Sequence, residues 1–295
     1  MELKPARTFQ EQVSILKSHG CIIEDEPACI DFLEKVNYYR LSAYFLPFRD
    51  ADQTYKEGTT FERIKMIYEF DQWLRLLIFA VVENIEVYTR TKLAYFHGHK
   101  YGPHGYWAAE NFNTTHDHHH FINQIQAEVE RNKNALWVKH HRRTYGGKFP
   151  VWAIVELFSF GMLSRFYADF PLDDRKQIAA EFHTKEAYLG SWLRAVTLLR
   201  NTCAHYGRLY YAMFTSIPKI PPHLKLTHTG MLFDQLLTLK LLTPDPVTWN
   251  TVFLANISAL VEEYSEFIEL SHIGFGEEWE SILRIASPQD KSRPQ

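Results

Sequence analysis

The sequence has few of the features that mark a secreted, metal-binding or membrane-spanning protein. Its 295 residues include three cysteines, Cys21, Cys29 and Cys203, and no C-x-x-C pair. This composition argues against a disulfide framework and against a zinc-finger site. The longest apolar run, LLIFAVV, is much shorter than a membrane span, and the first residues, MELKPARTFQEQ, are too polar for a signal peptide. We therefore expect a reduced, soluble, cytoplasmic protein with no membrane partner.

An excess of charge of one sign is also missing. The chain has 32 lysines and arginines against 35 aspartates and glutamates, which gives a net charge of −3 with histidine neutral. Proteins that coat nucleic acids without sequence preference are usually strongly basic. An RNA or DNA partner would thus have to bind a local basic patch or a shaped site. No residue pattern calls for a metal or an organic cofactor, and we expect none.

Glycine and proline are sparse, with 13 of each, and alternation typical of strands is weak. Apolar residues recur instead at helical intervals along nearly the whole chain. The clearest example covers residues 61–96, where Asp71 and Arg75 are expected outside the apolar stripe, and the segment HKYGPHGYW should end this helix. The sequence predicts an all-α, multi-helix bundle.

We divide the chain into a small helical N-terminal unit (1–58), a helical core (59–225) and C-terminal helices that complete the bundle (226–295). Three segments are each expected to form one helix. PACIDFLEKVNYYRLSAY has Pro27 in its first turn, VWAIVELFSFGMLSRFYADF is interrupted by Gly161, and SWLRAVTLLRNTCAHYG ends near Gly207.

The segment LLRNTCAHYGRLYY concentrates reactive side chains. Asn201 and His205 are four residues apart and share a helix face, whereas Arg200 and His205 are separated by roughly 140° around the axis. In a purely structural interpretation, His205 and Arg208 complement the negative end of the helix and Asn201 is a satisfied core amide. In a functional interpretation, the same side chains form an active site.

The chemistry that would suit this group is cleavage of RNA. RNA carries its own nucleophile, the 2′-hydroxyl, so the enzyme has to supply a general base and a donor that stabilises the phosphorane. A histidine fits the first role and an arginine the second. Protonation of the 5′ leaving oxygen needs an acid on the opposite side of the phosphorus, and two copies related by a two-fold axis would provide it. No metal is required.

Several segments resemble, in the same order, the Abi family of bacterial abortive-infection proteins of the AbiD/AbiF type. They are VNYYRLSAYFLPFR, FDQWLRLLIFAVVENIEVYTRTKLAYF, YGPHGYW, VWAIVELFSFGMLSRFY and LLRNTCAHYGRLYY. The resemblance covers approximately residues 8–211. Beyond about residue 225 the chain is similar to the family only in being helical.

This family belongs to the HEPN superfamily, whose R-x(4–6)-H motif marks metal-independent ribonucleases. The resemblance implies that Arg200 and His205 are the motif residues and that Asn201 is the polar residue that often follows the arginine. It also implies a homodimer that cleaves RNA to a 2′,3′-cyclic phosphate and a 5′-hydroxyl, antiphage defence, and in some relatives control by a small non-coding RNA.

Two alternatives stay open. The protein is a non-catalytic RNA-binding or sensor member of the superfamily, or a tyrosine near the motif accepts a nucleotidyl group. The candidates for the second are Tyr206, Tyr210 and Tyr211.

Glu83, Glu86 and Arg90 form a polar stripe on the helix predicted for residues 61–96. They make either an ordinary intrahelical ion pair or a supporting layer that orients Arg200 or His205. Arg90 and His97 also have R-x(6)-H spacing and are a candidate second motif.

The densest basic run is KHHRRTYGGK, with Lys139, Arg142, Arg143 and Lys148 as candidate RNA contacts. An exposed helix end is the alternative. We interpret THDHHH as a solvated loop and not as a metal site. NYYR, which includes Tyr38, Tyr39 and Arg40, is expected to pack the N-terminal unit on the bundle. Cys203 is expected to be buried and inert.

Overall fold

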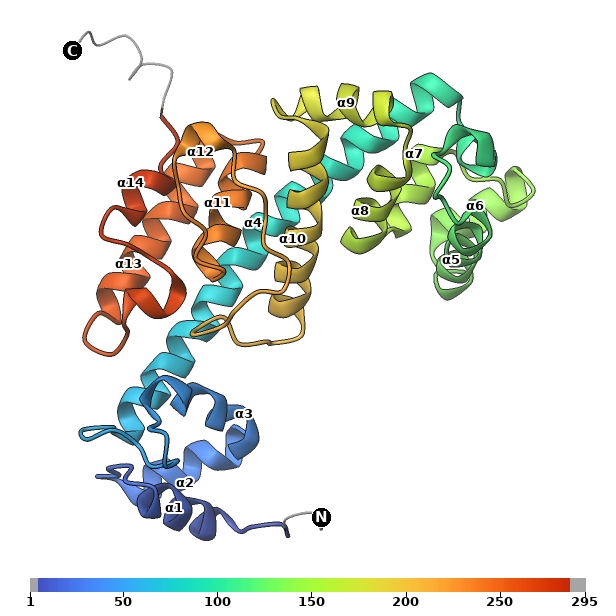
Figure 1. Cartoon of the computed structure of the whole chain (residues 1–295). Helices are drawn as coiled ribbons and strands as arrows, with labels where there is room; N and C mark the ends of the chain where they lie inside the picture. Colours follow the sequence, from blue (N-terminus) through green and yellow to red (C-terminus); the bar gives the residue numbers. More distant parts are fainter. Residues whose placement is uncertain (1–4, 287–295) are drawn as a thin grey trace, which may run out of the picture.

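The computed structural model describes residues 5–286 and has one long helix, α4 (Phe61–Tyr101), as its axis (Figure 1). Thr60 caps its first turn, and Gly102, with φ of 79°, ends it at the predicted glycine-proline cluster. The predicted helix is confirmed. The expectation for two of its residues is wrong, because Asp71 and Arg75 are 0% and 5% exposed and lie inside the bundle.

The N-terminal helices α1 (Phe9–Ser18), α2 (Glu26–Lys35) and α3 (Tyr38–Ser42) gather at the beginning of α4 (Figure 1). The single helix expected from PACIDFLEKVNYYRLSAY is broken. Val36 has an extended backbone, and the Asn37 side chain caps α3 by accepting a hydrogen bond from the Tyr39 amide at 2.8 Å. A 3₁₀ segment, Ala43–Phe48, then leads into the loop before α4.

A second group of helices surrounds the end of α4. It consists of α5 (His118–Arg131), α6 (Leu136–Thr144), α7 (Val151–Ile154) and α8 (Phe160–Asp169). The helix expected over VWAIVELFSFGMLSRFYADF breaks at Phe158 and not at Gly161. Ser159 begins α8 by accepting a hydrogen bond from the Met162 amide, and Gly161 lies within that helix.

The middle of α4 is covered by α10 (Glu186–Ala204) and by the C-terminal helices. α9 (Leu172–Glu181) precedes α10. α11 (Leu232–Leu242) packs on both α10 and α4, and α13 (Ala255–Glu263) packs on α4. α12 (Pro246–Thr248), a π-helical turn (Trp249–Leu254) and α14 (Trp279–Leu283) complete this layer. Buried side chains from Val13 to Leu283 form one hydrophobic cluster.

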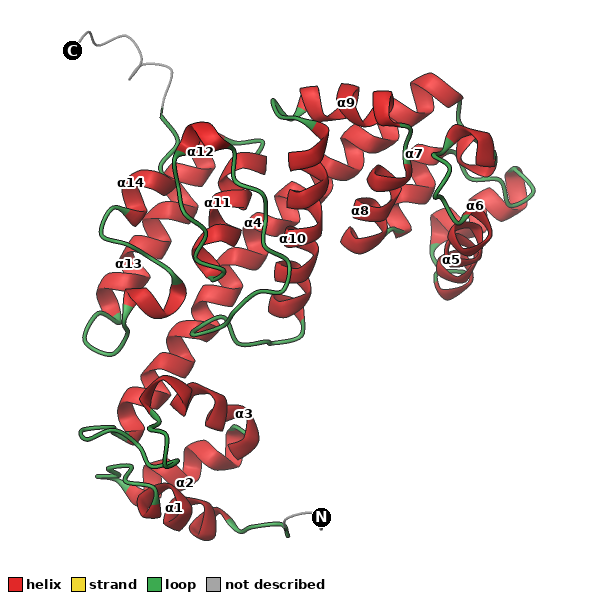
Figure 2. Cartoon of the chain, viewed as in Figure 1, coloured by secondary structure: helices red, strands yellow, loops and turns green. Residues whose placement is uncertain are grey.

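Helices and loops account for all of the described chain (Figure 2). The only extended pairings between residues 5 and 286 are two isolated bridges, Ile22 with Thr60 and Arg49 with Tyr55. The predicted all-α bundle is therefore confirmed. Within the same residues, none of the helices is both long and apolar enough to cross a membrane.

Candidate functional site

The Arg–Asn–His motif lies at the C-terminal end of α10, and His205 is the C-cap residue of this helix. The Tyr206 amide donates to the Cys203 carbonyl at 3.1 Å and the Gly207 amide to the Thr202 carbonyl at 2.7 Å. These two bonds form a Schellman turn. Its left-handed position is taken by Tyr206, with φ of 57°, and not by glycine. The helix thus ends where the sequence predicted, through a strained residue directly after His205.

A buried carboxylate on α4 fixes the backbone that follows this turn. Asp71 Oδ1 accepts hydrogen bonds from the amides of Leu209 at 3.0 Å and Tyr210 at 2.8 Å. Its other oxygen accepts from the Tyr44 hydroxyl at 2.6 Å and from the guanidinium of Arg75. Because every donor points at one carboxylate, residues 209 and 210 have a fixed position relative to α4.

Two arginines bind carbonyl groups of the same turn. Arg75 Nη1 donates to the Gly207 carbonyl at 3.2 Å, and Arg40 donates from both terminal nitrogens to the Tyr206 carbonyl at 2.7 and 2.5 Å. The packing role expected for NYYR is therefore incomplete: Arg40 holds the turn after His205, and Tyr39 is 86% exposed. The N-terminal helices thereby take part in building the site.

The guanidinium of Arg200 lies between α10 and α4. Its Nε is 3.7 Å from Oε2 of Glu86, and its Nη1 is 3.4 Å from the Asn201 side-chain oxygen. The guanidinium carbon also lies 5.9 Å from the centre of the Phe79 ring. Arg200 is thus oriented by a carboxylate while its side chain keeps 29% of its surface exposed.

Both interpretations of the polar stripe on α4 apply to Glu86. Its Oε1 accepts a hydrogen bond from Arg90 Nη2 at 2.8 Å, while Oε2 faces Arg200. Arg90 in turn donates to the carbonyls of Val155 and Phe158, both at 3.0 Å, and so holds the break between α7 and α8. Glu83 is exposed and points into a different groove, lined by residues of α12 and the π-helical turn.

His205 and Asn201 are exposed, so the purely structural interpretation of Asn201 as a core amide is wrong. Among the described residues, the imidazole of His205 accepts or donates no hydrogen bond, and its ring is available to a ligand. Arg208 is partly buried, and this burial lowers the pKa of its guanidinium. Burial raises the pKa of the Cys203 thiol to about 12, which fits the expected inert cysteine.

A cavity of about 580 Å³ opens beside the motif. Its walls combine residues of α4 with the end of α10, and Arg40 contributes from the N-terminal helices. Phe79, which lies under Arg200, and the 69%-exposed ring of Tyr206 are among the lining side chains. Of the three tyrosines considered as modification sites, Tyr210 is 0% exposed and is excluded as an acceptor.

The second R-x(6)-H pair is not a site. His97 is 0% exposed and stacks on Phe170 with 5.5 Å between ring centres. Burial lowers the pKa of His97 to about 4, so the ring is neutral and out of reach of a substrate. The R-x(6)-H spacing of Arg90 and His97 therefore does not mark a second motif.

The THDHHH segment is largely structural. Asp117 caps α5 by accepting from the His120 amide, and the side chain of His116 is only 2% exposed. Its Nδ1 lies 2.9 Å from an oxygen of Asp169 and its Nε2 lies 3.2 Å from Nδ1 of His118. The expectation of a solvated loop is wrong for His116. Across residues 5–286 no group of three or more metal-binding side chains is assembled.

The basic run lies away from the motif, on α6 and the turn that follows it (Figure 1). All four predicted RNA contacts are exposed, and Arg142 pairs with Glu130 at 3.0 Å. The motif contacts α4 between residues 71 and 86, whereas the turn after α6 approaches the other end of α4 at Pro103 and His104. At 1.5 Å per residue, roughly 22 Å of helix separates Glu86 from the end of α4 at Tyr101, and roughly 45 Å separates Asp71 from that end.

Three residues of the site were missed from the sequence: Tyr44, Asp71 and Arg75. The available signal was an Asp and an Arg four residues apart in an otherwise strongly apolar helix. Such a pair is normally placed on the solvent side. Its burial depends on backbone donors that lie more than 130 residues further along the chain.

The structure is that of an all-helical protein with Arg200 held against α4 and an exposed His205 at the end of α10. The family model described as Abi-like protein matches residues 31–211, which include Arg40, α4 and the whole motif. The chain belongs to this abortive-infection family. Searches of curated proteins and of solved structures found no match.

Proposed function

We propose that the chain is a metal-independent endoribonuclease of the HEPN type, of the AbiD/AbiF kind, that acts in antiphage defence. The observation that carries this proposal is the contrast at the end of α10. The backbone after His205 is fixed because its carbonyls accept hydrogen bonds from Arg40 and Arg75 and its amides donate to Asp71, while the imidazole is exposed and unpaired among the described residues. A fixed backbone with a free ring is what a general acid/base requires.

In the proposed reaction, His205 takes the proton of the RNA 2′-hydroxyl as its oxygen attacks the adjacent phosphorus. The bond from phosphorus to the 5′-oxygen breaks, and that oxygen receives a proton from an imidazolium. The products are a 2′,3′-cyclic phosphate and a 5′-hydroxyl. Arg200, oriented by Glu86, donates hydrogen bonds to the non-bridging oxygens, whose charge grows in the transition state.

The acid and the base have to stand on opposite sides of the phosphorus. One His205 cannot occupy both positions, so we place the active site between two copies of the chain, with one histidine from each. Asn201, exposed next to Arg200, positions that guanidinium through its side-chain oxygen. The partners implied are a second copy of the chain and RNA, either as substrate alone or also as a small regulatory RNA.

A non-catalytic RNA sensor is the second candidate. It is favoured by one observation, the exposed basic segment that lies more than roughly 20 Å along α4 from the motif. Such a sensor would bind RNA through that segment and would not depend on His205.

The test compares purified wild-type protein with His205→Ala and Arg200→Ala on a single-stranded RNA, in the presence of a metal chelator. We expect wild-type cleavage to leave cyclic-phosphate ends. Each substitution should slow cleavage by roughly 100-fold or more. His223→Ala, which removes another exposed histidine, is the matched control and should cleave normally. Equal cleavage by wild type and His205→Ala would refute the mechanism, and binding without cleavage by the wild type would favour the sensor.

A further inference from the structure

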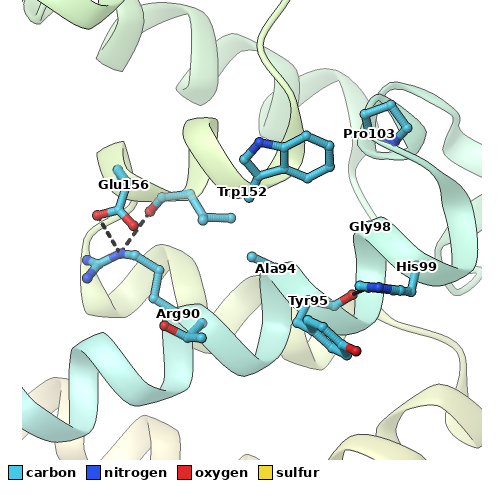
Figure 3. A pocket seen from close by; sticks show the side chains of 10 residues that line it. Arg90, Ala94, Tyr95, Gly98, His99, Pro103, Trp152 and Glu156 are labelled. Carbon is cyan, nitrogen blue, oxygen red and sulfur yellow. Dashed lines mark hydrogen bonds and ion pairs between the residues drawn. The ribbon is translucent and has the colours of Figure 1, made fainter.

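Two cavities lie side by side near the end of α4 and share Trp152 and Pro103 in their walls. One has a volume of about 510 Å³ and lies between α4 and α7 (Figure 3). The other has about 620 Å³ and extends towards the turn after α6. Both volumes are in the range of small-ligand sites. The indole of Trp152 separates them and is 57% exposed, which is unusual for so large an apolar ring.

The backbone beneath Trp152 is held firmly. The Val151 amide donates to the Pro103 carbonyl at 2.7 Å, which ties α7 to the segment after α4. Trp152 also packs closely over Gly98: a β-carbon there would lie 3.1 Å from Val151 Cγ1 and 3.5 Å from the indole. Figure 3 shows the indole across the first cavity from Ala94 and Tyr95. The exposed ring therefore projects from a backbone that is tied to the segment after α4.

The second cavity has another exposed ring and a cation. Tyr145 is 54% exposed and lies at the end of α6, with its ring centre 5.4 Å from that of His141. Gly146 and Gly147, with φ of 59° and 78°, form the sharp turn that places Lys148 beside it. The pKa of His104 is lowered mainly by the burial of its ring and, to a smaller extent, by the nearby positive charge of Lys148.

The charge of this region differs from that of the whole chain. Residues 131–155 contain six lysines and arginines and no aspartate or glutamate, in a protein with a net charge of −3. Among its exposed cations, Lys148 lines the cavity that Trp152 and Tyr145 also line, and Lys139 and Arg143 lie on α6, the helix that leads to Tyr145. Flat aromatic faces among cations match single-stranded nucleic acid, whose bases stack and whose phosphates are anionic.

We infer that this aromatic-basic cleft, formed by Tyr145, Lys148 and Trp152, binds single-stranded RNA by stacking unpaired bases on its two rings. The inference rests on the proposed function in one respect, because the ligand is the RNA that the motif would cleave. The cleft and the motif act on different parts of one strand: the cleft holds bases, and the motif reacts at a phosphate roughly 40 Å away along α4, where Asp71 and Arg75 hold the turn after His205. Arg90 connects the motif with the neighbouring first cavity, since it lines that cavity and pairs with Glu86.

The experiment measures the binding of a fluorescent 12-nucleotide RNA without secondary structure to full-length His205→Ala protein. This background separates binding from cleavage. Adding Trp152→Ala should weaken binding roughly 5- to 100-fold. Trp152→Phe, which keeps a stacking ring, should bind nearly as well as the parent. Trp73→Ala is the matched control, because Trp73 is 55% exposed on α4 but does not line the cleft.

Two further comparisons test the mode of binding. Lys148→Glu should weaken binding and lower the dependence of log affinity on log salt by about one, unlike the control Lys219→Glu at another exposed lysine. The same RNA annealed to its complement should bind more weakly, because its bases are already stacked. No RNA binding by the parent, tight binding by Trp152→Ala, or equal affinity for the duplex would each overturn the inference. If Trp152→Ala loses RNA binding while the wild-type protein does not cleave RNA, the inference about the cleft stands and the proposed nuclease activity is refuted.

Discussion

Replacing Asp71 with asparagine tests whether the buried carboxylate holds the motif. The substitution keeps the size of the side chain and so leaves no cavity. Oδ1 still accepts from the amides of Leu209 and Tyr210, but an NH₂ group now faces the Tyr44 hydroxyl and the Arg75 guanidinium. The side chain of Arg75 is 6% exposed and loses its only counter-charge in this site.

Removing one partner of a buried ion pair costs about 3–5 kcal/mol, because the remaining charge stays desolvated. For a chain of this length, that loss corresponds to a fall in Tm of roughly 5–8 °C. Urea denaturation gives the free energy of unfolding, and hydrogen exchange at the amides of residues 209 and 210 reports on the turn itself. We expect both amides to lose protection. Adding Arg75→Met should recover part of the stability, because it removes the unpaired charge.

The chain offers a matched control for this measurement. Asp31 and Lys35 on α2 form an Asp–Lys pair with the same spacing of four residues, but their side chains are 64% and 68% exposed. Asp31→Asn should cost less than about 0.5 kcal/mol. If Asp71→Asn costs no more than Asp31→Asn, the interpretation of Asp71 as a buried clamp for the motif is wrong.

Two other predictions concern single strained or buried residues. In His97→Phe, the stability should depend less on pH than in the wild type. Burial lowers the pKa of His97 from 6.5 to about 4, so between these pH values His97 is protonated in the unfolded chain and neutral in the folded chain. Stability is complete above pH 6.5 and is lost as the pH falls from 6.5 to 4. This loss amounts to about 2 kcal/mol at pH 5, and urea denaturation at pH 7 and pH 5 measures it. Equal pH dependence in both proteins would contradict the prediction. Tyr206→Gly should raise the free energy of unfolding by about 0.5–1 kcal/mol, because it relieves the left-handed backbone at φ of 57°. Thermal denaturation checks this, and a lower Tm would mean that the tyrosine ring makes a stabilising contact.

The long helices could be predicted because their signals are local. The apolar period of α4 is read directly from the sequence, and its end is marked by Gly102. The breaks at Val36 and Phe158 carry no glycine or proline and were missed. The first depends on a side-chain cap from Asn37. The second also needs Arg90, which lies 68 residues earlier in the sequence and donates a hydrogen bond to the Phe158 carbonyl. A contact between residues so far apart in the sequence cannot be predicted from the local spacing of apolar residues.

The site shows the same division. The family resemblance pointed to Arg200, Asn201 and His205 as candidates, and a polar stripe pointed to Glu86, because each of these signals lies within a short stretch of sequence. The residues that position them were predicted incorrectly. Asp71 and Arg75 were expected on the polar side of α4, since charged pairs at this spacing are usually solvated. Their burial is explained only by hydrogen bonds with backbone groups of residues 207–210, which are distant in the sequence and adjacent in the folded chain.

These contacts give α4 a role beyond that of a core helix. Along a single rigid element it fixes the backbone after His205 through Asp71 and Arg75, orients Arg200 through Glu86, and supports Trp152 through Gly98. Relative positions along one helix are set by its 1.5 Å rise and not by loop conformations. The proposed cleft for bases and the proposed site of phosphate chemistry can therefore keep a constant separation without contacting each other. By this argument, Gly98→Leu should reduce RNA affinity by displacing Trp152 while leaving the turn at His205 intact.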